Sequence, residues 1–111
     1  MRESDIVLID LIQSDGSYKL RPALILKRLP KYNDFLVCGI STQLHQYIEG
    51  LDEVLNKENN NFAATGLHQT SIIRLSFLAV IPSKNIPGVI GKIDYTLHKE
   101  LLQRLANFLV S

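Results

Sequence analysis

Residues 20–27 read Leu20-Arg21-Pro22-Ala23-Leu24-Ile25-Leu26-Lys27, and the rest of the chain can be interpreted from this stretch. Residues 22–26 carry no charged or hydrogen-bonding side chain, which is typical of a strand buried on both faces. Arg21 stands at the entrance of this strand. A rigid strand end holds a side chain in place, and a guanidinium keeps its charge at any physiological pH. The sequence therefore predicts a fixed cation at the edge of the core, for which the rest of the chain supplies partners.

Length and composition predict one soluble domain. With 111 residues the chain can build a single core, and its 46% of hydrophobic residues is typical of a globular protein. No apolar run approaches the roughly 20 residues that a membrane helix needs. Residues 1–5 lack the features of a signal peptide. Cys38, the only cysteine, lies in an apolar run, so we expect a buried inert thiol and a reducing cytoplasm.

The charges are unevenly distributed. A net charge of +1 argues against a protein that coats nucleic acid by bulk electrostatics. Between Asp15 and Asp34, however, there is no acid and there are five basic residues, Lys19, Arg21, Lys27, Arg28 and Lys31. This segment fits either a patch that binds a few phosphates or a charged edge that protects strands from aggregation.

The pattern of apolar residues and turns predicts a mainly β fold. Strands are expected at residues 5–11, from Arg21 onward, and at 35–40, 70–75 and 77–81, because β-branched and aliphatic residues dominate there. Turns are expected at 14–17, where Asp15-Gly16 suits a tight hairpin, at 29–34, and over the Pro- and Gly-rich residues 82–91. Residues 44–69 are less readable: 47–48 could extend a strand, 51–55 fit a short helix or a strand, and 57–61 read as a loop.

A helix is predicted at the C-terminus. Asp94 is a suitable N-cap, and five apolar residues follow at intervals of three or four, Leu97, Leu101, Leu105, Phe108 and Leu109. We expect this face to pack on the sheet, and we place His98 at the surface. With no internal repeat or linker, residues 1–111 are expected to form one small SH3-like antiparallel barrel closed by a C-terminal helix.

Several kinds of active site have no counterpart in the sequence. There is no Gly-rich phosphate loop, no Gly-x-Ser-x-Gly elbow and no His and Cys spacing suited to zinc, so no metal or cofactor is expected. What remains is a set of polar residues at strand ends, which one rim of a small barrel could bring together: Arg21, Ser41, Thr42, Gln43, His68, Thr70, Ser71 and Arg74. Each of them singly is more often a turn or capping residue.

The order of these motifs resembles the MazF/PemK (Kid) toxin family. The resemblance is carried by residues 5–10 (DIVLID), the turn 15–17 (DGS), 21–26 (RPALIL), 40–43 (ISTQ), 66–67 (GL) and 71–74 (SIIR). It continues through residues 77–81 and 90–93 to the last helix. The resemblance thus covers nearly the whole chain, and the Arg-Pro-Ala strand combined with the small-hydroxyl-Gln strand exit is its most specific part.

The resemblance implies a barrel of the kind shared with the gyrase poison CcdB, and an activity. It implies the toxin of a type II toxin–antitoxin pair, a homodimer that cleaves single-stranded mRNA selectively and without a metal. In this reaction the ribose 2′-hydroxyl attacks the adjacent phosphate and leaves a 2′,3′-cyclic phosphate and a 5′-hydroxyl. The antitoxin would contribute an acidic segment, disordered until bound, that covers Arg21.

The resemblance also implies roles for single residues. Arg21 would clasp the phosphate oxygens, the Ser41 hydroxyl would donate beside it, and Arg74 would stabilise negative charge, because an arginine is poorly suited to give up a proton. His68 is either an RNA contact or a proton carrier. The other candidate contacts of the single strand, chosen because they flank these residues, are Tyr18, Lys19, Thr42, Gln43, Thr70 and Ile72.

The sequence departs from the family pattern at three places. Ser41 stands where threonine is common, which keeps the hydroxyl. The loop at 15–20 lacks a glutamate that some relatives have, so the general base is unassigned and Asp15 is the nearest carboxylate. Ser76 replaces an aspartate of the PemK branch. Two alternatives to a nuclease are a barrel that poisons gyrase without cutting RNA and an inactive barrel that only binds an antitoxin. The presence of Arg21, Ser41 and Arg74 together favours the nuclease.

Overall fold

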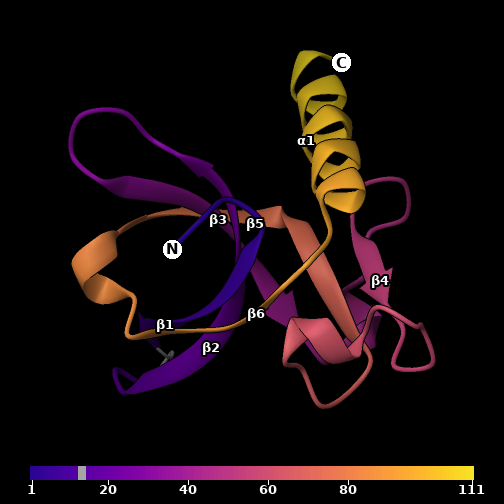
Figure 1. The fold of residues 1–111 in the computed structure, drawn as a ribbon, viewed down its shortest axis with the longest axis horizontal. Helices are drawn as coiled ribbons and strands as arrows, with labels where there is room; N and C mark the ends of the chain where they lie inside the picture. The colour runs from indigo at the N-terminus through magenta and orange to yellow at the C-terminus, as the bar shows by residue number, and fades with distance from the viewer. Residues whose placement is uncertain (13–14) are drawn as a thin grey trace.

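The chain folds into a strongly curved antiparallel sheet with a helix at its C-terminal end (Figure 1). The computed structural model describes residues 1–12 and 15–111. Within them lie six strands and one α-helix: β1 (Asp5–Ile12), β2 (Tyr18–Arg28), β3 (Asp34–Ser41), β4 (Glu53–Leu55), β5 (Ser71–Pro82), β6 (Gly88–Lys92) and α1 (Tyr95–Val110). The order of strands across the sheet is β4-β5-β3-β2-β1-β6. This half-barrel with a terminal helix confirms the predicted fold class.

Strand β2 begins at Tyr18, three residues before the predicted start at Arg21, and its residues 23–26 are buried on both faces, as predicted. Ala23 and Ile25 are 0% exposed and pack in one cluster with Phe35 and Val37. Leu24 and Leu26 are also 0% exposed and belong to the second cluster, which includes residues of α1. Alternate residues of one strand therefore fill two separate parts of the core.

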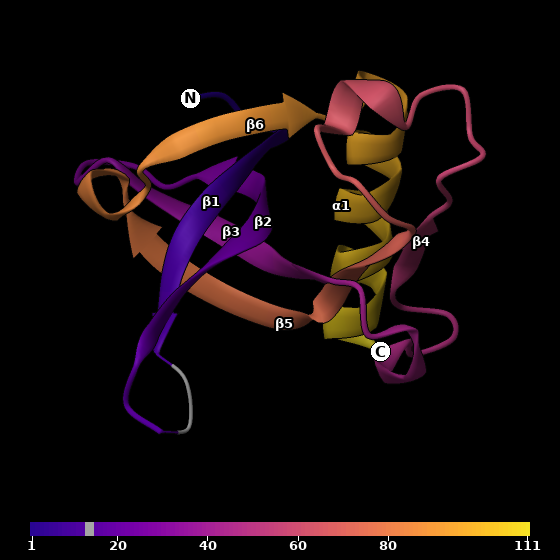
Figure 2. The ribbon, with the colours of Figure 1, turned by 90° about the horizontal axis from the view of Figure 1, so that it is seen from below.

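Helix α1 begins where the sequence predicted. The Asp94 carboxylate accepts a hydrogen bond of 2.7 Å from the Leu97 amide, which caps the helix. Leu101 and Leu105 are buried against the sheet, and Figure 2 shows the helix running along one side of it. The prediction was wrong for the last turn, because Phe108 is 55% exposed and Leu109 is 65% exposed. No described helix is long and apolar enough to cross a membrane.

The surface position predicted for His98 is also wrong. Its side chain is buried, and Nε2 lies 2.9 Å from the carbonyl oxygen of Leu26. The pairing of β2 with β3 shifts register between Ile25 and Lys27, so Leu26 is skipped and its carbonyl is left for the imidazole. A carbonyl only accepts, and Nε2 therefore carries a proton. The imidazole thus satisfies the Leu26 carbonyl, which has no partner in the sheet, at the place where the helix packs on the sheet.

The structure corrects one predicted segment and decides two that the sequence left open. The residues expected as strands 70–75 and 77–81 form one strand, β5, with a bulge between Arg74 and Leu78. Residues 51–55, for which helix and strand were both open, contain the short strand β4, while 47–48 are not part of a strand. The hairpin expected at 14–17 lies partly outside the described residues, and Gly16 within it has the positive φ (+86°) that a tight turn needs.

Strand β6 was not predicted at all. Residues 82–91 were expected to be a turn-rich connection, yet β6 pairs with β1 along the edge of the sheet. Its glycine allows a close packing contact: a Cβ at Gly91 would overlap the backbone of Thr65, and one at Gly66 would overlap that of Ile90. Gly66 also has a φ of +72°. Gly91 in this edge strand and Gly66 opposite it thus mark the close approach of two segments.

Candidate functional site

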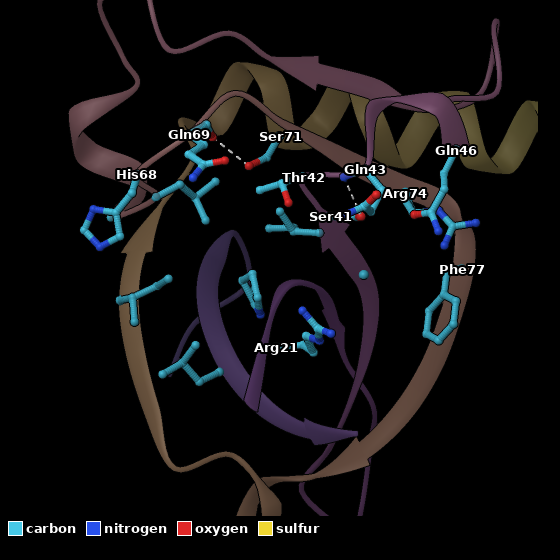
Figure 3. A pocket seen from close by; sticks show the side chains of 17 residues that line it. Arg21, Ser41, Thr42, Gln43, Gln46, His68, Gln69, Ser71, Arg74 and Phe77 are labelled. Atoms are coloured by element: carbon cyan, nitrogen blue, oxygen red, sulfur yellow. Dashed lines mark hydrogen bonds between the residues drawn. The ribbon is translucent and has the colours of Figure 1, made fainter. Parts of the chain in front are cut away.

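Three neighbouring strands bring the predicted catalytic residues to one place. Strand β3 lies between β2 and β5 in the sheet. Gly39 of β3 pairs with Arg74 of β5, and Ser41 follows two residues later along β3. Arg21 lies on β2, where it pairs with Ile9 of β1. Arg21, Ser41 and Arg74 all line one cavity of about 770 Å³, here called the cleft. Figure 3 shows Arg21 in the middle of the view, with Ser41 and Arg74 to one side.

The cleft contains six of the ten residues that the sequence proposed for the site. Besides Arg21, Ser41 and Arg74 they are Thr42, Gln43 and His68. In Figure 3, His68 lies on the opposite side of the cleft from Arg74 and Phe77. The structure therefore brings the two guanidinium groups and the serine hydroxyl to one cavity and places the imidazole at its other wall.

Four of the ten proposed residues do not line the cleft. Ile72 is 0% exposed and pairs with Ser41 on one side and Val54 on the other, so its prediction as an RNA contact is wrong in this conformation. The Thr70 hydroxyl accepts a hydrogen bond of 3.0 Å from the Lys57 amide and holds a loop. Tyr18 and Lys19 are exposed at the start of β2, two and three residues before Arg21. They remain available to a ligand that extends beyond the cleft.

Arg74 is held at the cleft with a donor that has no partner among the described residues. Its Nε is buried and unbonded, although its guanidinium carbon lies 5.7 Å from the centre of the Phe77 ring. That ring packs on Gly39, where a Cβ would approach it to 3.3 Å. A buried donor without an acceptor is unfavourable by about 1–3 kcal/mol. An anion that enters the cleft and accepts from Arg74 would remove this cost.

The cleft is positively charged. Its described lining includes two arginines and one histidine and no aspartate or glutamate. Within the described chain, the ion pairs involve Lys27 and Arg104 and neither cleft arginine. A concave surface lined by one sign of charge raises the local concentration of the opposite charge. The arrangement suits an anionic ligand.

Ser41 lines the cleft and its hydroxyl is held by the backbone. Its Oγ accepts a hydrogen bond of 3.0 Å from the Gln43 amide, which orients the side chain. Because a hydroxyl both donates and accepts, its proton can still be donated. The nearby Ser71 hydroxyl differs, because it donates to the Gln69 carbonyl at 2.7 Å.

Asp15 lies outside the cleft. It is the carboxylate that the sequence analysis named as nearest to the site when the general base was left unassigned. It is exposed in the loop between β1 and β2, where Oδ1 accepts hydrogen bonds from the amide and the hydroxyl of Ser17. These bonds lower the pKa of Asp15 from its ordinary value, the hydroxyl contributing most. A base assigned to Asp15 has no support from this geometry. Among the described residues, no group of three His, Cys, Asp or Glu side chains could hold a metal ion.

The other residues that line the cleft include two glutamines and a phenylalanine that the sequence did not single out, Gln46, Gln69 and Phe77. Gln46 belongs to a short 3₁₀ helix (Leu44–Gln46) within the segment that the sequence left unassigned. Phe77 follows Arg74 by three residues, which in a regular strand would place the two on opposite faces. Only the bulge in β5 puts both at the cleft, and no periodic pattern predicts it.

Comparisons with known proteins show the fold and the family of the chain. The solved structure of the Mycobacterium tuberculosis toxin MazF-mt6 superposes with a TM-score of 0.69, over 93% of either chain and at 24% sequence identity. That likeness shows the fold. A search of curated proteins gave no match. The profile of a family described as the PemK-like, MazF-like toxin of type II toxin–antitoxin systems matches residues 2–109. The chain therefore belongs to the PemK-like, MazF-like family of type II toxins.

Proposed function

We propose that the protein is the toxin of a type II toxin–antitoxin pair and acts as a metal-independent endoribonuclease on single-stranded mRNA. The observation that carries the proposal is the cleft, whose described lining includes Arg21, Arg74 and Ser41 and no carboxylate. Family membership supports the toxin role. Two guanidinium groups facing one cavity fit a phosphodiester better than any neutral ligand.

The proposed reaction is an internal transesterification. The 2′-oxygen of a ribose forms a bond to the adjacent phosphorus while the bond from phosphorus to the 5′-oxygen breaks. The 2′-hydroxyl loses its proton and the leaving 5′-oxygen gains one, so the products are a 2′,3′-cyclic phosphate and a 5′-hydroxyl. Negative charge grows on the equatorial phosphate oxygens in the transition state, and fixed donors around those oxygens lower the barrier most.

The cleft residues supply such donors. Arg21 is exposed on β2 shortly before the fully buried residues 23–26, so its charge is carried on a rigid support. Arg74 is held beside Phe77 and offers donors that its own chain leaves unused. Ser41 adds a hydroxyl proton. We assign charge stabilisation to both arginines, and to Ser41 a hydrogen bond to a phosphate oxygen.

The flanking nucleotides would bind along the cleft rim. Thr42, Gln43 and His68 line the cleft and present polar groups for base edges or neighbouring phosphates. Tyr18 is 68% exposed and, with Lys19, extends the surface along β2 beyond Arg21. Unstacked bases bind aromatic surfaces, whereas a duplex keeps its bases stacked and presents mostly backbone. This favours single strands as substrate.

The same surface would receive the antitoxin. The lining of the cleft is partly apolar, and Phe77 within it is 40% exposed. An acidic segment with apolar anchors would complement both the charge and the apolar lining and cover Arg21. We further propose that the toxin works as a homodimer in the cytoplasm.

The test uses the purified protein and a long single-stranded RNA in EDTA. We expect fragments that end in cyclic phosphate, identified by mass spectrometry, and no cleavage when the 2′-hydroxyl at the cut site is replaced by hydrogen. Arg21→Ala should lower the rate by about 100- to 1,000-fold, the range for loss of one transition-state donor, with the far-UV circular dichroism spectrum unchanged. Arg2→Ala is the matched control, because it removes the same charge from an exposed residue outside the cleft.

Other outcomes would overturn the proposal. Intact RNA together with an inhibited topoisomerase would identify a gyrase poison. Intact RNA together with tight binding of an antitoxin would identify an inactive binding barrel. Full activity of Arg21→Ala would show that the site is elsewhere.

A further inference from the structure

Arg74 and Phe77 share the cleft only because β5 is irregular. Residues three apart in a regular strand point to opposite faces of the sheet. Here Cys38 of β3 pairs with Leu78 and the next residue, Gly39, pairs with Arg74. Three residues of β5, 75–77, therefore stand opposite a single step of β3. This bulge returns Phe77 to the side on which Arg74 lies, where the guanidinium is 5.7 Å from the ring centre.

A buried carboxylate from another part of the chain holds the bulge. Asp52 is 2% exposed. Its Oδ1 accepts from the Ser76 amide at 3.1 Å, and its Oδ2 accepts from the Ser76 hydroxyl at 3.2 Å and from the Ile48 amide at 3.0 Å. Ser76 is the middle residue of the bulge. The carboxylate thus satisfies the amide that the bulge removes from the ladder, and it ties β5 to the segment before β4.

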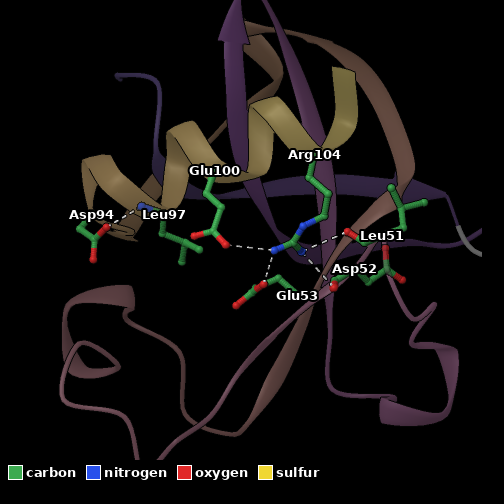
Figure 4. Close-up of polar contacts among 7 residues, drawn as sticks. All are labelled: Leu51, Asp52, Glu53, Asp94, Leu97, Glu100 and Arg104. Carbon is green, nitrogen blue, oxygen red and sulfur yellow. Dashed lines mark hydrogen bonds and ion pairs between the residues drawn. The ribbon is translucent and has the colours of Figure 1, made fainter. Parts of the chain in front are cut away.

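Asp52 is itself fixed by helix α1, as Figure 4 shows. The Arg104 Nη1 donates to the backbone carbonyls of Leu51 at 3.3 Å and Asp52 at 3.2 Å. Its Nη2 donates to Glu53 at 2.9 Å and lies 3.5 Å from Glu100. The position of the carboxylate is therefore set from both sides, by the helix through its backbone and by Ser76 and Ile48 through its side chain.

We propose that Asp52 is a positioning residue for the cleft: by holding Ser76 it fixes the bulge that places Arg74 and Phe77. Its catalytic consequence rests on the proposed function, whereas its effect on Arg74 does not. Asp52 does not line the cleft, so it acts on the ligand only through these neighbours. A small displacement of a group that stabilises charge is costly, on the order of 100-fold for about 1 Å.

The experiment compares Asp52→Asn with the wild type. Asparagine is nearly the same size but has one acceptor oxygen, so it can accept from only one of the Ser76 and Ile48 amides. We expect kcat for RNA cleavage to fall about 10- to 100-fold, with KM changed less than about threefold, because Arg21 and the rim residues still bind the strand. Ser76→Ala, which loses only the hydroxyl contact, should reduce kcat in the same direction and less.

A second readout needs no cleavage. In ¹H–¹⁵N spectra, the Nε–H of Arg74 should give a signal protected from exchange, since this atom is buried; Arg74→Lys identifies the signal by its loss. We expect the signal to shift and to exchange faster with solvent in Asp52→Asn. If the wild type cleaves no RNA, the proposed function fails, while this signal still tests the role of Asp52. If Asp52→Asn does not fold, the same Arg74 signal measured in Ser76→Ala tests the role of Asp52.

The matched control is Asp94→Ala, which removes a carboxylate that caps α1 far from the bulge. It should lower thermal stability while kcat and the Arg74 signal stay those of the wild type. The proposal is overturned if Asp52→Asn keeps the wild-type kcat and Arg74 signal, or if Asp94→Ala impairs both to the same degree.

Discussion

The two cleft arginines differ in how they are held. Arg21 is exposed on β2 ahead of its buried residues, whereas Arg74 is partly buried beside Phe77 and keeps an unbonded Nε. An exposed arginine loses little by being unpaired, because water solvates it. A buried donor has no such compensation. Arg74 is therefore the residue at which shape, as well as charge, should matter.

Arg74→Lys tests this difference. Lysine keeps the charge but has a single ammonium group, which cannot reproduce the planar fork of donors. We expect single-turnover cleavage to slow by about 10- to 100-fold, somewhat less than for loss of a whole donor group. Thermal unfolding should change little. A rate equal to that of the wild type would show that Arg74 serves the fold alone.

Glu3 gives a pH-dependent prediction. Its carboxylate accepts from the Arg28 amide at 2.9 Å and lies 3.6 Å from the Lys27 ammonium. The Arg28 hydrogen bond most of all, and then the Lys27 charge, lower the pKa of Glu3 below its ordinary 4.5. The carboxylate therefore stabilises the fold fully above pH 4.5, and this contribution is lost as the pH falls through the lowered pKa.

Glu3→Gln should consequently be less stable than the wild type at pH 7, by about 1 kcal/mol. The difference should shrink as the pH is lowered below 4.5. Urea unfolding at pH 7 and pH 3 measures both values, with the exposed Glu58→Gln as control. A difference that stays constant over this range would contradict the assignment.

At the scale of elements, two irregularities in the sheet expose backbone groups that bond to side chains of other segments. The register shift in β2 leaves the Leu26 carbonyl to His98 of α1, and the bulge in β5 leaves the Ser76 amide to Asp52. In both cases a distant polar side chain takes the place of a ladder partner. These contacts hold the elements in a defined arrangement, since an unpaired buried group is costly.

The contact between Gly66 and β6 predicts a large effect for Gly66→Ala. The backbone at this position has a positive φ, which is strained for a residue with a Cβ, and the added methyl group would overlap the Ile90 backbone. We expect a loss of about 3 kcal/mol, from roughly 1 kcal/mol for the backbone conformation and the rest for overpacking. Gly50→Ala is the control, since Gly50 has a φ of +83° and no atom within 4 Å of its Cβ position.

For Gly50→Ala the loss should be about 1 kcal/mol, because only the backbone term applies. Chemical denaturation of the two variants separates the contributions. Equal losses would mean that η2 (Ala63–Thr65) and β6 can move apart without cost.

At the scale of the whole molecule, binding depends on where the charge lies and little on its sum. The net charge is +1, yet two guanidinium groups face one cleft without a described acid. Nucleic-acid affinity falls with salt according to the number of phosphates that are neutralised. Because only two arginines line the described cleft, we expect the affinity for RNA to depend weakly on salt concentration.

With two phosphates neutralised, log K should fall with log salt at a slope of about −1.4, which is twice the −0.7 per phosphate of single strands. Arg21→Ala should reduce the slope by about half. Fluorescence anisotropy with a 2′-O-methyl RNA oligonucleotide, which cannot be cleaved, measures both. A slope near −5 would reveal a much larger phosphate-binding surface, and equal affinity for duplex RNA would contradict selectivity for single strands.

Much of the core could be predicted from local pattern. The uncharged run before Lys27 predicted a strand buried on both faces, and Asp94 with the leucines after it predicted the start of α1. Burial of such residues follows from their own polarity and that of their close neighbours. The strand β6 was missed because its Pro and Gly neighbours resemble a turn, and His98 was misplaced because its acceptor lies 72 residues away.

For the candidate site, the sequence predicted which residue types take part but could not predict how they are arranged. Arg21, Ser41 and Arg74 stood out at the ends of predicted strands, because each position joins a rigid element to a polar group. That they share a cleft depends on the order β5-β3-β2, and that Phe77 joins them depends on hydrogen bonds that Ser76 donates to Asp52, 24 residues away in the sequence. Local polarity determines which residues are buried, but hydrogen bonds between distant segments determine which functional groups meet.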